Sequence, residues 1–486
     1  MLSSRKTFVL NIMFIAILIY GIAIIPSLFF AARYNETELV ESMGTIAIVC
    51  IPLGILGYRI LPNNFENVKM SVCYTTTLLT WLTVIILTIL PYYFSGMGYK
   101  FIDCLFEAVA SWTTTGASAI PTESLPIALK IWRSTCNWMG GIGIILLTLS
   151  FLPSWQFVGQ KLASTEIRGP GFLMSTTTFR KAYRRILIVY FCMTIIHYIT
   201  LRVAGMTQIN SVLTALSNVS TSGLQHLNNG VITGFTLPVK IVITVFALLG
   251  SINVSVFVMV LIGKFRIILK QSELKLYLLI IAISTTLITI SSVLSDHSSG
   301  ILQALGNSFM QVVSFASTAG YIVTGNGNPN AFYICIVTML MFVGACAIST
   351  GGGLKVSRIV YALKSLSLNL YTHIHPNSIR TVTYNKKPVD KNNLTQSNIY
   401  IALFMLFYII GGILISVDGT DVYTSLSYSQ AMLTNVGSPI SELADPGIVS
   451  GMSDYAKSIM CFLMLCGRLE IYPVMMIFSF RNWSRK

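Results

Sequence analysis

Four short tracts of threonine, serine and glycine interrupt an otherwise apolar chain, and they constrain its fold more than any other feature. They read Thr113-Thr114-Thr115-Gly116-Ala117, Ser220-Thr221-Ser222-Gly223-Leu224, Ser317-Thr318-Ala319-Gly320-Tyr321 and Thr434-Asn435-Val436-Gly437-Ser438. We call them tracts 1 to 4. Their glycines are 107, 97 and 117 residues apart. The spacing predicts four related units whose tracts meet around one axis.

The composition is that of an integral membrane protein. The chain is 54% hydrophobic and 10% charged, whereas a soluble domain carries about 25% charged residues. Its nine cysteines show no repeated C-x-x-C spacing, which favours buried thiols over disulfides or metal sites. The net charge of +15 suits either nucleic-acid binding or basic cytoplasmic loops, and the positions of the charges decide between the two.

Ten apolar stretches are long enough to cross a membrane, which takes about 20 residues. They are 8–30, 43–61, 72–93, 131–152, 186–203, 239–262, 276–294, 332–348 with an apolar continuation to 370, 399–417 and 457–480. The first follows Arg5 and Lys6 and is too long for a signal-peptide core, so we expect it to be retained.

Shorter helical stretches end at the tracts and cannot span the membrane. They lie near 101–112, 209–219, 301–315 and 425–433. The predicted fold class is therefore an all-α polytopic membrane protein, with two leading transmembrane helices and four pseudo-symmetric helix–pore-helix–helix repeats around a central pore. The expected units are 1–69 for the leading helices and 70–160, 180–270, 271–372 and 395–486 for the repeats.

The charges predict the orientation. With the N-terminus inside and ten alternating spans, cytoplasmic segments carry 24 Lys and Arg against 4 Asp and Glu, and outer segments carry 7 against 12. Such an excess of basic residues marks the cytoplasmic side. It places both termini in the cytoplasm and all four short helices on the outer side, and it makes a nucleic-acid partner unnecessary.

Four glycine-containing loops around an axis suit a cation path. Non-helical backbone at membrane depth must find partners for its carbonyls, and a ring of carbonyls replaces the water around an ion. Glycine allows the backbone conformations required and leaves the axis open. The helix C-termini also point partial negative charge at the axis. Outer acids are either ordinary solvated residues or attract cations; they are Glu123, Asp296, Asp418, Asp421, Glu442 and Asp445.

On these residues the chain resembles the bacterial Trk/Ktr/HKT superfamily of potassium uptake channels, with the TrkH branch nearest. The resemblance covers the whole chain, including the two leading spans. Further stretches that carry it are Trp138-Met139-Gly140-Gly141-Ile142-Gly143, Ser349-Thr350-Gly351-Gly352-Gly353-Leu354-Lys355, His375-Pro376-Asn377 and Gly467-Arg468-Leu469-Glu470.

The resemblance implies a potassium selectivity filter built from the tracts. The expected K⁺-binding residues are Thr114, Thr115, Gly116, Thr221, Ser222, Gly223, Thr318, Ala319, Gly320, Asn435, Val436 and Gly437. Glycine in all four tracts implies potassium over sodium. Asn435 and Val436 depart from the threonine pattern, so we expect four chemically unequal sites.

The apolar run 332–370 is about 39 residues, which as one helix would be about 58 Å long, nearly twice the hydrocarbon thickness. It must break, and the family resemblance implies a gate there, an intramembrane loop below the filter. The gate residues are Ser349, Thr350, Gly351, Gly352, Gly353 and Lys355. The alternative is a plain helix terminus at the cytoplasmic face. We expect the third repeat both to select and to gate.

Arg468 is an ionisable residue within the last span, which makes it a candidate for a charge that lines the pore. Glu470 lies two residues away, so the pair should not be assumed to interact. A structural, hydrogen-bonding arginine is the alternative.

No nucleotide-binding or nucleophile motif is present in the sequence, so we expect no enzyme and no organic cofactor, with K⁺ as the transported ion. His373 and His375 fit a solvated loop better than a metal site. The resemblance implies a homodimer in the bacterial inner membrane, with a TrkA-like cytoplasmic regulatory subunit that binds nucleotides. Two rivals remain: a K⁺ symporter coupled to H⁺ or Na⁺, and a membrane protein that transports nothing.

Overall fold

A computed structural model describes residues 4–61, 68–143, 161–162, 176–223, 230–232, 234–261, 263, 271–294, 300–323, 330–376, 381–384, 387–389, 391–440 and 448–475. Among the sequence predictions, Asp296, Glu442, Asp445, Leu224 and Asn377 lie outside these residues.

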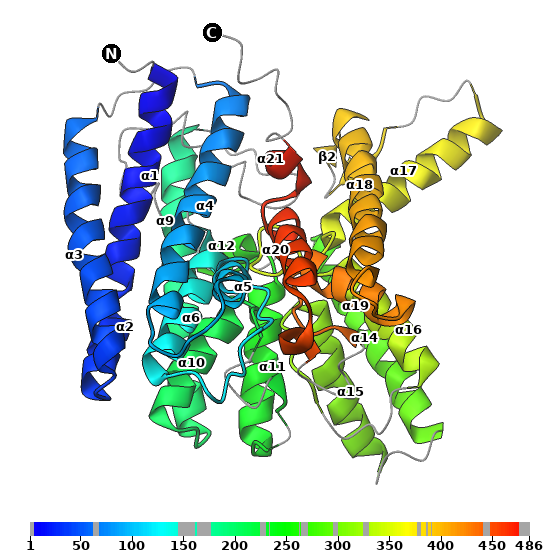
Figure 1. Cartoon of the computed structure of the whole chain (residues 1–486). Coiled ribbons are helices and arrows are strands. Elements are labelled where there is room, and N and C mark those ends of the chain that lie inside the picture. Colours follow the sequence, from blue (N-terminus) through cyan, green and yellow to red (C-terminus); the bar gives the residue numbers. More distant parts are fainter. Residues whose placement is uncertain are drawn as a thin grey trace.

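The chain begins with a helical hairpin. α1 (Ser4–Ala23) and α2 (Ile25–Arg33) run almost continuously and are separated at Ile24, just before a proline in the first turn of α2. α3 (Thr37–Ile60) returns beside them and packs against α1 (Figure 1). Gly54 and Gly57 let α3 approach closely, because a side chain at either position would overlap Leu18 or Phe14 of α1.

Four units follow, each made of a long helix, a short helix that ends at a tract, and a second helix. They are α4 (Met70–Tyr93), α5 (Phe101–Trp112) and α6 (Ile127–Ile142); α9 (Thr176–Val203), α10 (Gln208–Val219) and α11 (Leu237–Ser251), continued by α12 (Val254–Leu261); α14 (Ser272–Leu294), α15 (Ile301–Ala316) and α16 (Ala331–Val343), continued by α17 (Val356–Ile374); and α18 (Lys391–Ser416), α19 (Val422–Leu433) and α20 (Asp454–Arg468), continued by α21 (Ile471–Met475). The predicted short helices are confirmed, each to within three residues at its ends.

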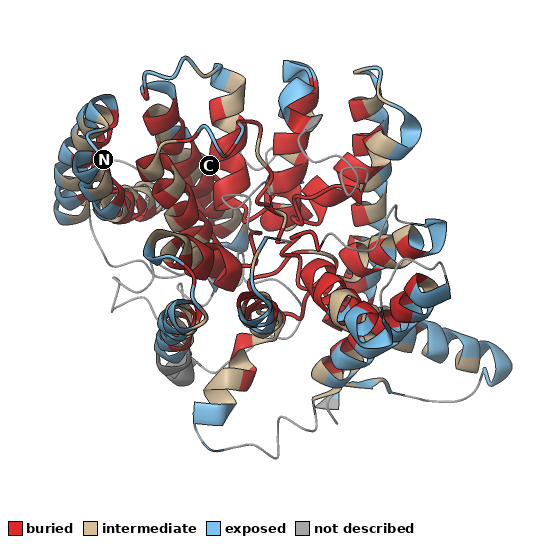
Figure 2. Ribbon diagram, turned by 90° about the horizontal axis from the view of Figure 1, so that it is seen from below, coloured by how far each residue is buried: buried red, intermediate tan, exposed pale blue. Residues whose placement is uncertain are grey.

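The units close into a ring. The short helix of each unit packs on the second helix of the unit before it: α10 on α6, α15 on α11, α19 on α16 and α5 on α20. Figure 2 shows the result from below, with buried segments gathered at the centre and exposed residues on the outer sides of the helices. Two strands, β1 (Thr383–Tyr384) and β2 (Lys387–Pro388), form a small antiparallel hairpin, and a short 3-10 turn covers Ile448–Gly451.

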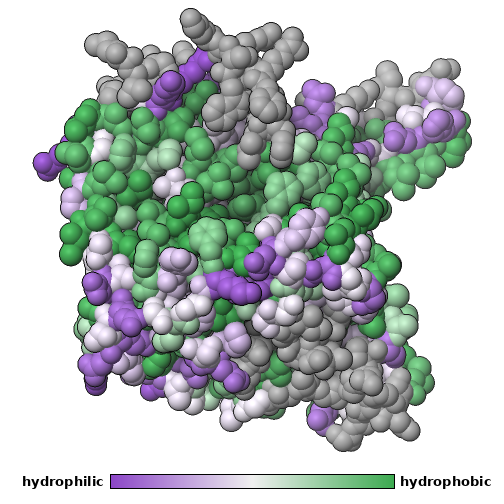
Figure 3. All heavy atoms as spheres, viewed as in Figure 1, coloured by the Kyte–Doolittle hydropathy of each residue, from purple (hydrophilic) through white to green (hydrophobic). Residues whose placement is uncertain are grey.

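Within the described residues, six helices are long and apolar enough to span a membrane, and a seventh span is possible if the bent pair α11 and α12 counts as one. Of three further expected crossings, at 131–152, 332–348 and 457–480, the described residues form the shorter helices α6, α16 and α20, while 144–152 and 476–480 lie outside the described part. Ten spans therefore stay a prediction. In Figure 3, hydrophobic side chains form a broad band across the upper half of the visible face, and hydrophilic ones gather mainly below it.

The second helix of every unit stops early. α6 has 16 residues, α11 has 15, α16 has 13 and α20 has 15. α11 and α12 meet at a bend of 94°. The sequence predicted such a break in the third unit alone, so this fourfold pattern is a structural finding.

Candidate functional site

The four short helices end in the same way. Thr113, Ser220, Ser317 and Thr434 keep right-handed backbone, and the next residue has a positive φ of 54° to 63°. The residue after that donates its N–H back to the last turn, as from Thr115 to the Ala110 carbonyl at 3.0 Å. This is a Schellman C-cap, in which the left-handed position ordinarily holds glycine.

Here the left-handed position holds threonine three times and asparagine once, at Thr114, Thr221, Thr318 and Asn435. A β-branched residue with positive φ is an outlier that costs about 1–3 kcal/mol. The side chains must therefore be held by other contacts, and they are. Thr318 Oγ1 accepts a hydrogen bond from the Gly352 N–H at 2.7 Å, and Asn435 Nδ2 donates to the Met464 carbonyl at 3.0 Å.

Each tract glycine lies against a backbone carbonyl of the next tract, in cyclic order. A Cβ on Gly116 would overlap the Ser222 carbonyl oxygen, and one on Gly223 would come within 2.7 Å of the Ala319 carbonyl oxygen. A Cβ on Gly320 would overlap the Val436 carbonyl oxygen.

The circle closes at the fourth tract, where a Cβ on Gly437 would overlap the Thr115 carbonyl oxygen. All four glycines also have positive φ, from 67° to 83°. The structure therefore brings all twelve predicted filter residues into one closed ring, buried at the centre of the molecule.

The loop after α16, residues 344–355, lies directly against this ring. Thr350 Oγ1 donates to the carbonyls of Val219 and Gly250, at 3.1 and 3.0 Å. Gly353 donates its N–H to the Thr434 carbonyl at 3.0 Å, and a Cβ on Gly352 would overlap the same oxygen. With the bond from the Gly352 N–H to Thr318 Oγ1, the loop contacts the ends of α10, α15 and α19.

Lys355 holds the loop in this shape. Its side chain is fully buried, and its Nζ donates to the carbonyls of Cys346 and Gly351 and to Ser349 Oγ. Its φ of 76° turns the chain into α17. The Glu273 carboxylate accepts the Ala347 N–H at 2.6 Å from the other side. Glu273 was not singled out from the sequence, where nothing marks a lone acid at the start of an apolar span.

Arg468 joins the ring to the loop. Its guanidinium donates to Thr114 Oγ1 at 3.1 Å, to the Thr350 carbonyl at 3.0 Å, and to the carbonyls of Gly140 and Gly141. Glu470, two residues further on, binds Arg358 at 2.6 Å. The arginine is 6% exposed.

Glycines let the second helices reach the ring. A Cβ on Gly140 would overlap the Trp112 carbonyl, and one on Gly467 would overlap the Leu433 carbonyl. A Cβ on Gly250 would likewise lie 3.0 Å from the Val219 carbonyl oxygen. Each of these carbonyls belongs to the last residue of a short helix.

Sequence comparison matches most of the chain to a known family. The family model for TrkH, described as a cation transport protein, matches residues 42–485. The Trk system potassium uptake protein TrkH of Escherichia coli K12 is 27% identical over 435 residues, covering 87% of this chain and 88% of the relative.

TrkG of the same organism, also a Trk system potassium uptake protein, is 27% identical over 470 residues and covers 96% of both chains. The crystal structure of the potassium transporter TrkH from Vibrio parahaemolyticus superposes with a TM-score of 0.84 at 21% identity, over 98% of this chain and 99% of that one.

Proposed function

Because the chain belongs to the TrkH family of cation transport proteins, we propose that it takes up potassium through the ring formed by its four tracts. The observation that carries the proposal is the cyclic contact of each tract glycine with the middle carbonyl of the next tract. A closed ring of backbone oxygens with no side chain at four of its positions suits a dehydrated cation.

In this proposal, the backbone and the side chains of the ring residues have different roles. The tract backbone supplies oxygens to K⁺, and the four helix C-termini add partial negative charge. The Thr114 hydroxyl contacts Arg468, and the hydroxyls of Thr221 and Thr318 contact the loop. The Asn435 amide instead donates to Thr115 Oγ1 and to the Met464 carbonyl. All four side chains are buried, which supports a role in positioning.

The loop 344–355 serves as the gate in this proposal. It contacts the ends of three short helices, so an ion that leaves the ring inward would meet it. Lys355 and Arg468 add positive charge at the same level, which would slow cation passage until the loop moves.

The proposed setting is the bacterial inner membrane, with both termini in the cytoplasm and the ring toward the outside. A homodimer and a TrkA-like cytoplasmic subunit that binds nucleotides complete the proposal. The division into units 1–69, 70–160, 180–270, 271–372 and 395–486 belongs to it as well.

A channel-like path is favoured over a coupled symporter by the state of Glu470. Glu470 is an acid within the last predicted span, 457–480, and its carboxylate is bound to Arg358. Inward movement of a cation across 100 mV yields about 2.3 kcal/mol, which is sufficient to drive uptake.

The test is cation flux in proteoliposomes that contain purified protein, with potassium replaced by sodium in parallel vesicles. Wild type should pass potassium in preference to sodium. Gly320→Ser should lower the K⁺/Na⁺ flux ratio by about tenfold, equal to about 1.4 kcal/mol, because its Cβ would displace the Val436 carbonyl.

Gly306→Ser is the matched control, because Gly306 lies in α15 with open space around it. It should leave the ratio unchanged. Equal flux of both ions in wild type, or a Gly320→Ser protein with the wild-type ratio, would contradict the proposed ring function.

A further inference from the structure

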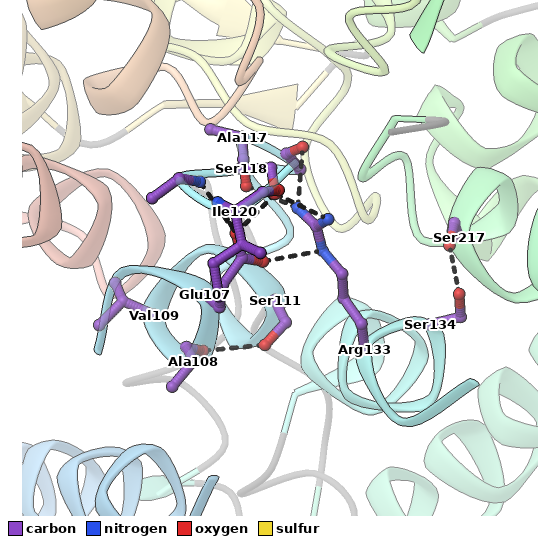
Figure 4. Close-up of polar contacts among 12 residues, drawn as sticks. Glu107, Ala108, Val109, Ser111, Ala117, Ser118, Ile120, Arg133, Ser134 and Ser217 are labelled. Carbon is purple, nitrogen blue, oxygen red and sulfur yellow. Dashed lines mark hydrogen bonds and ion pairs between the residues drawn. The ribbon is translucent and has the colours of Figure 1, made fainter. Parts of the chain in front are cut away.

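A buried ion pair lies beside the first tract. Glu107 of α5 and Arg133 of α6 face each other, with Arg133 Nε 3.4 Å from Glu107 Oε2 (Figure 4). Their side chains are 0% and 5% exposed. A buried ion pair is weak support for stability, since removing two charges from water offsets most of their attraction.

The arginine binds the tract itself. Arg133 Nη2 donates to the Ala117 carbonyl at 2.6 Å and, more weakly, to the Gly116 carbonyl at 3.4 Å. Its Nη1 donates to Ser118 Oγ at 3.2 Å. The guanidinium thus fixes two successive carbonyls where tract 1 leaves the ring.

The glutamate binds the next residues of the same segment. Glu107 Oε1 accepts the N–H groups of Ala119 and Ile120 at 2.9 and 3.2 Å, and the Ser118 hydroxyl at 2.5 Å. The two side chains therefore hold opposite ends of the segment 116–120, as Figure 4 shows.

The other units show that backbone support alone does not need a charge. Glu107 lies nine residues before the tract glycine, and the corresponding residues are Thr214, Gln311 and Tyr428. In the third unit, Gln311 Oε1 accepts the Val323 N–H at 2.8 Å, three residues after Gly320, just as Glu107 does at Ala119. A neutral amide can carry that bond.

The first unit differs in that the charge of Glu107 also holds the Arg133 guanidinium at the carbonyls of tract 1. We propose that Glu107 and Arg133 are a positioning pair, in which Arg133 fixes the outer carbonyls of tract 1 and Glu107 neutralises and orients it, so that the pair sets potassium affinity and selectivity. This inference rests on the proposed ring function.

The charge of Glu107 and the hydrogen bonds of Arg133 to the tract carbonyls should have separable effects on potassium binding and on ion discrimination. Loss of the Glu107 charge leaves an uncompensated cation beside the ring and should weaken potassium binding. Loss of Arg133 frees the Gly116 and Ala117 carbonyls and should relax the spacing on which ion discrimination depends.

The experiment compares Glu107→Gln, Arg133→Gln and the double variant in proteoliposomes, with the potassium concentration at half-maximal flux and the K⁺/Na⁺ flux ratio as readouts. Glu107→Gln should raise the half-maximal concentration about tenfold. Arg133→Gln should lower the ratio about tenfold. The double variant should regain most of the affinity but not the ratio, because it is neutral while its carbonyls remain free.

Asp103→Asn is the matched control. Asp103 lies on the same helix and pairs with buried Lys457 at 2.6 Å, so this variant also leaves a buried cation unpaired, on α20. It should keep the wild-type flux ratio.

If Arg133→Gln and the double variant fold and keep both wild-type values, the pair is only structural and the inference is wrong. Should they fail to fold, Arg133→Lys decides: it keeps the charge but cannot bind Glu107 and both carbonyls together, so an unchanged ratio contradicts the inference. Wild-type protein that passes no potassium would instead contradict the proposed function.

Discussion

Single residues in strained backbone connect the ring to the loop below it. Thr114 and Thr318 adopt positive φ at a helix end where glycine would be unstrained, and each places its hydroxyl on a partner at the level of the loop. The sequence marked these threonines as filter residues, but it could not reveal their strain, since C-cap geometry depends on where the helix stops. Strain of this kind persists only where the surroundings hold it.

Arg468 is predicted to limit potassium flux. Arg468→Gln removes a cation that binds Thr114, Thr350 and Gly141, so potassium flux of the isolated protein should rise. Because these hydrogen bonds are lost, the free energy of unfolding should fall by about 1–3 kcal/mol. Proteoliposome flux and thermal melting measure the two effects. Arg468→Lys, which retains the charge, should keep flux low. Native rate and selectivity in Arg468→Gln would show that the residue does not limit conduction.

Among the elements, the short helices were predictable and the broken second helices were not. The short helices end at polar tracts, which are visible in the sequence. Only the run 332–370 is too long for one crossing, so length exposed a break there; the apolar runs at 131–152 and 239–262 fit a membrane without one. Their breaks follow from packing, because Gly140 and Gly250 approach the ends of neighbouring short helices.

The loop after α16 can be tested by shortening it. Deletion of residues 347–353 removes the contacts of Thr350, Gly352 and Gly353 with the ring. The isolated protein should then carry at least about tenfold more potassium, equal to about 1.4 kcal/mol in favour of the open state. Deletion of 383–388 in the β1–β2 hairpin is the control and should leave potassium flux unchanged. A folded protein with unchanged flux after the first deletion would exclude the loop as a gate.

Asp421 caps α19, the short helix of the fourth unit, by accepting the Thr424 N–H at 3.1 Å. Hydrogen bonds from Thr424 hold the pKa of the Asp421 carboxyl below its ordinary value. A lowered folded-state pKa contributes stability above the unfolded value of about 3.9, and this contribution is lost as pH falls through the folded-state pKa. The neutral cap in Asp421→Asn cannot titrate.

The advantage in Tm of wild type over Asp421→Asn should therefore be largest near neutral pH and vanish on acidification below about pH 4. Melting curves of the two detergent-solubilised proteins over a pH series measure it. A Tm difference that does not vary with pH would show that the carboxylate charge adds nothing to the cap.

For the whole molecule, charge distribution predicted the orientation, and helix contacts supply the closure that sequence could not. The repeats have diverged too far for tract spacing to give their cyclic order, whereas the packing of α5 on α20 joins the last unit to the first. The Glu107–Arg133 pair was not predictable from the sequence for a related reason: its residues are 26 positions apart and meet only when α5 and α6 fold together.

The predicted orientation can be tested by labelling introduced cysteines. In whole cells, a membrane-impermeant maleimide should label Glu123→Cys, which lies exposed between α5 and α6 on the predicted outer side. It should label His373→Cys, exposed near the end of α17, only after the cells are permeabilised. Wild type, with its nine cysteines, supplies the background. The reverse pattern would invert the topology.

Because one chain supplies all four sides of the ring, a single codon change alters one quarter of it. In a ring of four identical subunits, the same change would appear four times at once. Each position here can vary without its counterparts. If the ring acts as proposed, natural variation can adjust ion preference in small steps, and neighbouring quarters can acquire different roles. The Glu107–Arg133 pair beside tract 1 and the loop 344–355 of the third unit are two features that occur in a single unit among the described residues.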